Sequence, residues 1–144
     1  MPARRVLVDT GPLVALFDRA DRHHQVCVEC WRSLKYPVET VLPVLTEVFH
    51  LLDFSAEARS AVYDLLAQGA VRIDELAADD LVRVRELVTR YADTPMDFAD
   101  GCLLRVAERE DIRTVFTLDR RGFGIFAPRH VRRMTILPAP LRDR

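Results

Sequence analysis

The sequence has no apolar run long enough to cross a membrane, and it has almost no lysine. A membrane-spanning helix needs about 20 consecutive apolar residues, and a secretory signal needs about 7 to 15 together with a cleavage site. The first apolar run, at residues 5–9, meets neither requirement. We therefore expect a cytoplasmic protein with no membrane association. Arginine carries nearly all of the positive charge, because Lys35 is the only lysine.

Cysteine is scarce, and neither sign of charge dominates. The 144 residues include three cysteines, and an odd number in a chain of this size is typical of reduced thiols. With 21 basic and 22 acidic residues, the net charge of −1 lacks the positive excess that marks the simplest nucleic-acid-binding proteins. The length and the 49% of hydrophobic residues predict one globular domain over residues 1–144.

Short apolar runs alternate with segments of helical periodicity along the chain. The runs predict strands at residues 5–9, 38–42, 71–73, 114–118 and 134–137. The helical spacing predicts helices at residues 13–17, 21–34, 43–54, 55–69, 78–91 and 97–110. A loop is predicted at residues 121–124. This alternation predicts an α/β fold with a mainly parallel sheet.

Two of the predicted strands end in an aspartate. Asp9 closes the first strand, and Asp119 closes the Thr-Val-Phe-Thr-Leu run. A single aspartate in such a place is more often a turn or capping residue. Parallel-sheet proteins, however, carry their sites beyond the carboxyl ends of the strands, so we expect the two carboxylates to meet at one edge.

Asp97 and Asp100 begin a predicted helix, and helix capping explains the first of them better than the second. Asp97 is a natural N-cap. An acid at the third helical position also favours the positive end of the helix dipole. Because Asp100 precedes the apolar run that follows Gly101, an orientation toward the sheet edge is the alternative.

Glu47 lies in the middle of an apolar predicted helix. One interpretation places it on a narrow solvent-facing stripe beside His50. The other starts from the cost of burying a carboxylate without a partner. A cation bound among several carboxylates would remove that cost.

Together these acids form a candidate site for a divalent cation. The set is Asp9, Glu47, Asp97 or Asp100, and Asp119. Mg²⁺ and Mn²⁺ prefer oxygen ligands of this kind. The main chemistry of such clusters is phosphodiester hydrolysis, in which the cation activates water and neutralises charge on the phosphate.

Four short motifs contain these acids, and together they resemble a known family. The motifs are Val6-Leu-Val-Asp-Thr-Gly11, Thr46-Glu-Val48, Asp97-Phe-Ala-Asp-Gly101 and Thr117-Leu-Asp119 followed by Phe123. Their order and spacing over residues 6–126 resemble the PIN-domain nucleases, and most closely the VapC-like toxins of bacterial toxin–antitoxin pairs. Each motif is short, but the combination is specific.

The resemblance implies a three-layer α/β/α PIN-like fold with a central, mainly parallel sheet. It also implies a Mg²⁺- or Mn²⁺-dependent endoribonuclease that acts on RNA, forms a homodimer and is inhibited by a cognate antitoxin. In chain order, the implied metal-binding acids are Asp9, Glu47, Asp100 and Asp119. Thr10 and Thr117 match hydroxyl positions that hydrogen-bond in the site, and Asp97 ranks below Asp100. The departure is Gly101, where the family more often has alanine.

The helices between residues 21 and 68 carry more apolar side chains than one face of a sheet needs. These side chains include Trp31, Phe49, Phe54 and Tyr63. Surplus apolar surface usually marks an interface, and two-fold dimers are the commonest assembly. This argument independently predicts a homodimer.

Two other features of the sequence have a structural and a functional interpretation. The pair Cys27 and Cys30 has the spacing of a zinc or redox motif, but a structural zinc site needs four ligands and a redox motif opens a helix after a strand. Packing is therefore the favoured role for both thiols. Residues 120–144 hold seven arginines, which form either a solvated face or a phosphate-contacting rim around the acids.

Two other functions fit parts of the sequence. Phosphotransfer on Asp9 fits the first motif, but such enzymes need a lysine near the phosphoryl group, and Lys35 follows an amphipathic helix. The haloacid-dehalogenase pattern also needs a second aspartate where Gly11 stands. The other alternative is a catalytically inactive interaction module of the same fold, and the retention of all four acids argues against it.

Overall fold

The computed structural model describes residues 4–140, and its centre is a sheet of five parallel strands. The strands are β1 (Val6–Val8), β2 (Val38–Thr40), β3 (Val71–Ile73), β4 (Thr114–Phe116) and β5 (Thr135–Leu137). Their order across the sheet is β3-β2-β1-β4-β5. β1 therefore pairs with β2 on one side and with β4 on the other, at the centre of the sheet.

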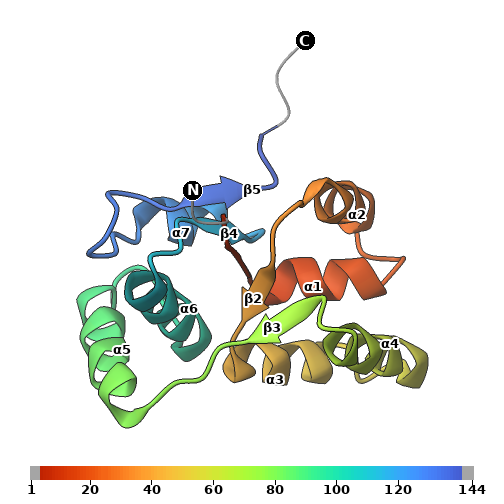
Figure 1. Ribbon diagram of the computed structural model, residues 1–144, viewed down its shortest axis with the longest axis horizontal. Coiled ribbons are helices and arrows are strands. Elements are labelled where there is room, and N and C mark those ends of the chain that lie inside the picture. The colour runs from red at the N-terminus through yellow and green to blue at the C-terminus, as the bar shows by residue number, and fades with distance from the viewer. Residues whose placement is uncertain (1–3, 141–144) are drawn as a thin grey trace.

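Helices cover both faces of this sheet (Figure 1). They are α1 (Thr10–Phe17), α2 (His24–Ser33), α3 (Leu42–Leu51), α4 (Ala56–Ala67), α5 (Ala78–Arg90), α6 (Phe98–Glu110) and α7 (Arg120–Ile125). α5 and α6 lie on one side of the strands, whereas α1, α2 and α4 lie on the other. The predicted three-layer α/β/α fold with a parallel sheet is confirmed. Across residues 4–140, no helix has the length and apolar content needed to span a membrane.

The burial of β1 explains why the sequence marks it so clearly as a strand. Val6, Leu7 and Val8 are each at most 2% exposed, as expected for a central parallel strand that is covered on both faces. At the edge of the sheet, β3 buries only Val71 of its three residues. The residue that follows β1 is thus held by the most rigid part of the core.

A short helix, α7, forms where the sequence predicted a loop. Gly122 and Gly124 lower the helix propensity of this segment, which is why the prediction of a loop at residues 121–124 was wrong. Asp119 compensates as the N-cap, because its Oδ1 accepts a hydrogen bond from the Gly122 N–H at 3.0 Å. Phe123 is buried and anchors the turn to the core.

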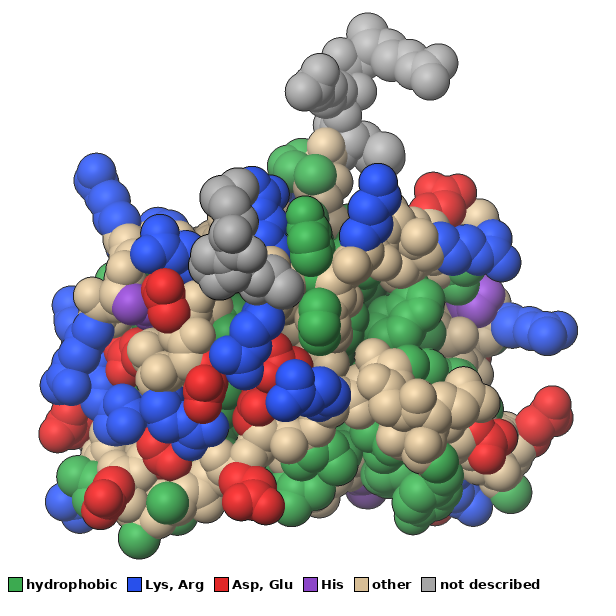
Figure 2. Space-filling view, viewed as in Figure 1, with side chains coloured by type: hydrophobic (Ala, Val, Ile, Leu, Met, Phe, Trp, Pro, Cys, Tyr) green, Lys and Arg blue, Asp and Glu red, His purple; other side chains and the backbone are tan. Residues whose placement is uncertain are grey.

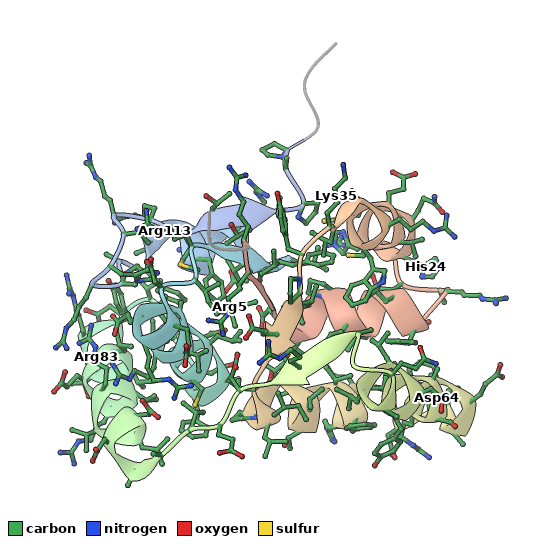
Figure 3. All side chains as sticks on the ribbon, in the orientation of Figure 1. Arg5, His24, Lys35, Asp64, Arg83 and Arg113 are labelled. Atoms are coloured by element: carbon green, nitrogen blue, oxygen red, sulfur yellow. The ribbon has the colours of Figure 1, made fainter. Side chains whose placement is uncertain are left out.

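Arginine–carboxylate pairs fasten α5 to α6. Asp80 is 4% exposed and accepts hydrogen bonds of 2.8 Å from both Arg105 and Arg109. Arg83, labelled in Figure 3, pairs with Glu108 at 2.8 Å. Figure 2 shows the resulting mixture of basic and acidic side chains over these two helices. Much of the arginine on this face is therefore engaged in holding the fold together.

Candidate active site

Asp9 occupies the point where the central strand ends and α1 begins. It is 8% exposed, and both of its carboxylate oxygens accept hydrogen bonds. Oδ1 accepts from the Thr10 N–H at 2.8 Å, which caps the helix, and Oδ2 accepts from the Thr117 hydroxyl at 2.7 Å. Because Thr117 follows β4, this second bond joins the ends of two neighbouring strands.

Thr10 connects Asp9 to the acid on α3. Its hydroxyl donates a 2.6 Å hydrogen bond to Oε2 of Glu47, which is half-buried. His50, one turn further along α3, is exposed. The hydrogen bond from Thr10 therefore explains how this apolar helix accommodates a half-buried glutamate.

Asp97 and Asp100 cap the first turn of α6 reciprocally. The Asp97 carboxylate accepts from the Asp100 N–H at 2.8 Å, and the Asp100 carboxylate accepts from the Asp97 N–H at 3.3 Å. Capping thus involves Asp100 as well, which the sequence argument weighted too little. Asp100 is nevertheless buried, whereas Asp97 is exposed.

Asp119 reaches the same edge of the sheet through its backbone. Its N–H donates to the Thr117 hydroxyl at 3.0 Å, and that hydroxyl donates to Asp9. Its exposed carboxylate accepts from Gly122 at the start of α7. In the described structure the side chain of Asp119 therefore acts as a cap beside the buried acids.

Burial and neighbouring carboxylates raise the pKa values of Asp9 and Asp100. Burial, followed by the charges of Asp9 and Asp97, raises the pKa of Asp100 to about 8. Burial raises the pKa of Asp9 to about 6, with further contributions from Asp97 and Glu47, although the Thr117 and Thr10 hydrogen bonds act in the opposite direction. Four carboxylates from α1, α3 and α6 thus interact electrostatically, and a bound cation would relieve their repulsion.

The donor chemistry of this cluster suits a hard divalent cation, because every candidate ligand is a carboxylate. Between residues 4 and 140, however, no group of three or more His, Cys, Asp or Glu side chains is arranged so that it could hold a metal ion as it stands. The expected convergence of four carboxylates with room for a cation is therefore not present in this arrangement.

The raised pKa values predict how the stability of the metal-free protein depends on pH. A carboxyl whose pKa is higher in the folded state binds its proton more tightly when folded, so stability falls as pH rises from about 4 through the folded pKa. We expect stability in EDTA to fall by about 2 kcal/mol or more between about pH 5 and pH 8. Urea unfolding of wild type and Asp100→Asn measures this difference. A variant that loses as much stability as wild type contradicts the assignment to Asp100.

The carboxy-terminal arginines do not form one rim around these acids. Arg129 lies against Glu86 and Glu108, near the last turn of α6, whereas Asp100 is in its first turn. Arg120 and Arg121 directly follow Asp119. The two arginines at positions 142 and 144 lie outside the described residues. The hypothesis of a rim that includes Arg129 was therefore wrong, because the chain carries this residue to the opposite end of the helix.

A second acidic group, formed by Glu39 and Asp74 around Arg5, was missed by the sequence argument. Glu39 in β2 is fully buried and pairs with Arg5, which lies between the strands and α6 in Figure 3. Burial, followed by the charge of Glu39, raises the pKa of Asp74 nearby to about 6. The available signal was the glutamate inside an apolar strand. Arg5 also pairs with Glu110 at 3.3 Å, in the last turn of α6, whereas Asp100 is in the first turn of this helix, so the group is separate from the candidate site.

The cysteines behave as packing residues in the structure. Cys27 and Cys102 are buried, Cys30 is half-buried, and all three are free thiols. Burial raises the pKa of Cys27 to about 11, which keeps this thiol protonated and unreactive at neutral pH.

The sequence and the fold were compared with those of known proteins. The family model described as the PIN domain matches residues 6–127. Ribonuclease VapC26 of Mycobacterium tuberculosis is 31% identical over 135 residues, which cover 92% of this chain and all of that protein. The PIN-domain match extends over all the candidate acids.

Solved structures share the fold at lower sequence identity. VapC20 of M. tuberculosis, described as a sarcin–ricin loop cleaving toxin, superposes with a TM-score of 0.76 at 24% identity, covering 88% of this chain and 98% of that one. VapBC2 from Rickettsia felis, bound to a promoter DNA fragment, gives a TM-score of 0.66 at 14% identity and covers 92% and 96% of the two chains.

Proposed function

The chain belongs to the PIN domain family, and on that premise we propose that it is a divalent-metal-dependent endoribonuclease of the VapC-like toxin group. The observation that supports this most directly is a pair of threonines: Thr10 joins Asp9, through its N–H, to Glu47, through its hydroxyl, and the Thr117 hydroxyl joins Asp9 to the end of β4. The same edge carries Asp100, whose pKa is raised by burial and then by the charge of Asp9. The related M. tuberculosis protein is named a ribonuclease. Phosphotransfer on an aspartate has no comparable support.

In this proposal Mg²⁺ or Mn²⁺ is held by four acids, with three residues in support. The acids are Asp9, Glu47, Asp100 and Asp119. When bound, the cation activates water and neutralises charge that builds on the phosphate. Thr10 positions Glu47, Thr117 positions Asp9, and Asp97 caps the helix that carries Asp100. Because Asp9 and Asp100 hold their protons more tightly than usual, cation binding should release protons and strengthen with rising pH.

Metal removal tests the proposal. We expect wild type to cleave a mixed RNA pool in Mg²⁺ or Mn²⁺, to stop in EDTA, and to recover when excess cation is restored. Sequencing of the new RNA ends measures the cleavage. Cleavage at an undiminished rate in EDTA would exclude the metal-dependent mechanism, and no cleavage of any RNA with either cation would favour an inactive interaction module.

The proposal extends to the setting in which the protein acts. We propose that residues 1–144 form one nuclease domain, that it acts in the cytoplasm on RNA, and that a cognate antitoxin protein inhibits it. Support for the antitoxin comes from structural neighbours that are toxin–antitoxin complexes, such as VapBC2 from R. felis and a complex from Klebsiella pneumoniae.

We further propose a homodimer, because apolar side chains remain exposed on α3, α4 and the loop between them. Leu51, Phe54 and Tyr63 are 51%, 68% and 62% exposed, respectively. Light scattering is expected to give twice the 16.5 kDa chain mass, and Tyr63→Glu should shift the protein toward monomer. Val82→Glu is the matched control, since this residue is equally apolar and 56% exposed but lies on α5. A monomeric wild type at micromolar concentration contradicts the dimer.

A further inference from the structure

A cavity of about 210 Å³ adjoins the candidate active site. It lies between the residues that follow β4, those that follow β5 and the start of α2. Thr117 lines the cavity, and its hydroxyl donates the 2.7 Å hydrogen bond to Asp9. The cavity and the acidic site therefore share one residue, and a group in the cavity would lie next to whatever the acids bind.

Most of the cavity wall is apolar. Val26 contributes from α2, and Leu118 contributes from the end of β4. Leu118 packs so closely on Gly11 that a Cβ added there would lie 3.3 Å from Leu118 Cδ1. Gly11 is the second residue of α1, so Leu118 packs against the same helix that Asp9 caps.

Pro138, Ala139 and Pro140 add a further apolar segment, and two polar side chains also line the cavity. Arg120 bridges the cavity, because its Nη1 donates a 2.6 Å hydrogen bond to the carbonyl oxygen of Pro138. His23 lines the cavity from the N-cap position of α2. The cavity thus combines apolar walls with a planar guanidinium and an imidazole.

This combination matches a nucleobase better than it matches a phosphate. Proteins bind unstacked bases of single-stranded RNA between apolar surfaces and the planes of aromatic, histidine or arginine side chains. A phosphate would need several unpaired cations, and the apolar walls offer it no hydrogen bonds. The volume lies below the roughly 300–1,000 Å³ of pockets for drug-sized ligands, so it suits a single ring system.

We propose that this cavity binds the base of a nucleotide next to the scissile phosphate and so sets the sequence preference of cleavage. The proposal rests on the proposed ribonuclease function. It assigns to Arg120 and Val26 a role in specificity, distinct from the acids that carry the chemistry. Arg120→Gln removes the planar cation, and Val26→Phe fills the cavity from a rigid helix.

An RNA substrate with single abasic positions tests the proposal. In wild type, removing the base at one fixed position relative to the cut should slow cleavage about tenfold, as expected for the loss of one stacked base. In Arg120→Gln and Val26→Phe, the same abasic position should cost less than about twofold. Arg121→Gln is the matched control, because this exposed neighbour does not line the cavity and should keep the wild-type dependence.

The abasic experiment overturns the proposal in either of two ways. The first is cleavage by wild type with no dependence on any flanking base, and the second is full dependence retained in both Arg120→Gln and Val26→Phe. Thermal melting identifies a variant that fails to fold, and the remaining variant then decides the outcome.

Binding of uncharged nucleosides separates this proposal from the ribonuclease function. Adenosine, guanosine, cytidine and uridine lack the phosphate, so they can occupy the cavity in EDTA. At least one of them should shift the NMR methyl signals of Val26 and Leu118, and Arg120→Gln should weaken that shift. Binding without RNA cleavage supports the cavity and refutes the ribonuclease. Cleavage without a shift from any nucleoside refutes the cavity alone.

Discussion

Replacing Asp9 with asparagine is expected to reduce RNA cleavage by about a thousandfold or more and to leave the fold intact. Asparagine keeps the shape of the side chain but removes the negative charge that a divalent cation needs. Its amide oxygen can still accept from the Thr10 N–H, so the cap of α1 survives. The rate of cleavage of a mixed RNA pool measures the loss.

The stability of the same variant provides its control. Without metal, the charge on Asp9 is disfavoured, because burial raises the pKa of this carboxyl to about 6. Removing the charge should therefore stabilise the metal-free protein. Part of this gain is lost, because the Thr117 hydroxyl donates to Asp9 in wild type and would face the amide group of asparagine in the variant. Melting in EDTA should show an unchanged or higher midpoint. A variant that cleaves at the wild-type rate would remove Asp9 from the mechanism.

The second large effect is a difference in cleavage rate between variants of two aspartates that are three residues apart, Asp97 and Asp100. Asp100→Asn should abolish cleavage to the same degree as Asp9→Asn, because Asp100 is buried beside Asp9 and interacts with its charge. Asp97→Asn should cost less than about tenfold, because asparagine caps a helix about as well as aspartate. Cleavage rates of the two variants, measured side by side in Mg²⁺, give the comparison.

Two results would alter this assignment. Equal losses in both variants would place Asp97 among the metal-binding acids. A folded but inactive Asp97→Asn beside an active Asp100→Asn would reverse the two roles. Thermal melts of both proteins show whether the reciprocal cap of α6 is intact.

The fold followed from the sequence wherever burial and periodicity act together. The run at residues 6–8 is buried on both faces, so its apolar pattern is continuous and identifies a central strand. α7 was missed because its stability comes from a tertiary anchor, Phe123, and from the cap at Asp119. Neither contribution is visible in the helix propensity of a segment with two glycines.

The members of the site were predictable, but their contacts were not. Strand ends and helix starts fixed where Asp9, Asp100 and Asp119 lie, because parallel strands bring such positions to one edge. Which way a carboxylate turns depends on donors that are distant in sequence, such as the Thr117 hydroxyl for Asp9. The course of the chain after α7 decides where the arginines go, and no local pattern encodes it.

The placement of β1 between β2 and β4 has a consequence for the growing chain. Asp9 and its Thr117 partner are 108 residues apart, so a ribosome adding about 5–20 residues per second needs roughly 5–20 s to make the second after the first. Until β4 is synthesised and docks beside β1, Asp9 lacks the Thr117 hydroxyl that orients it. A chain that ends between α6 and β4 therefore carries Asp9, Glu47 and Asp100 but lacks Thr117 and Asp119, so it has no complete site.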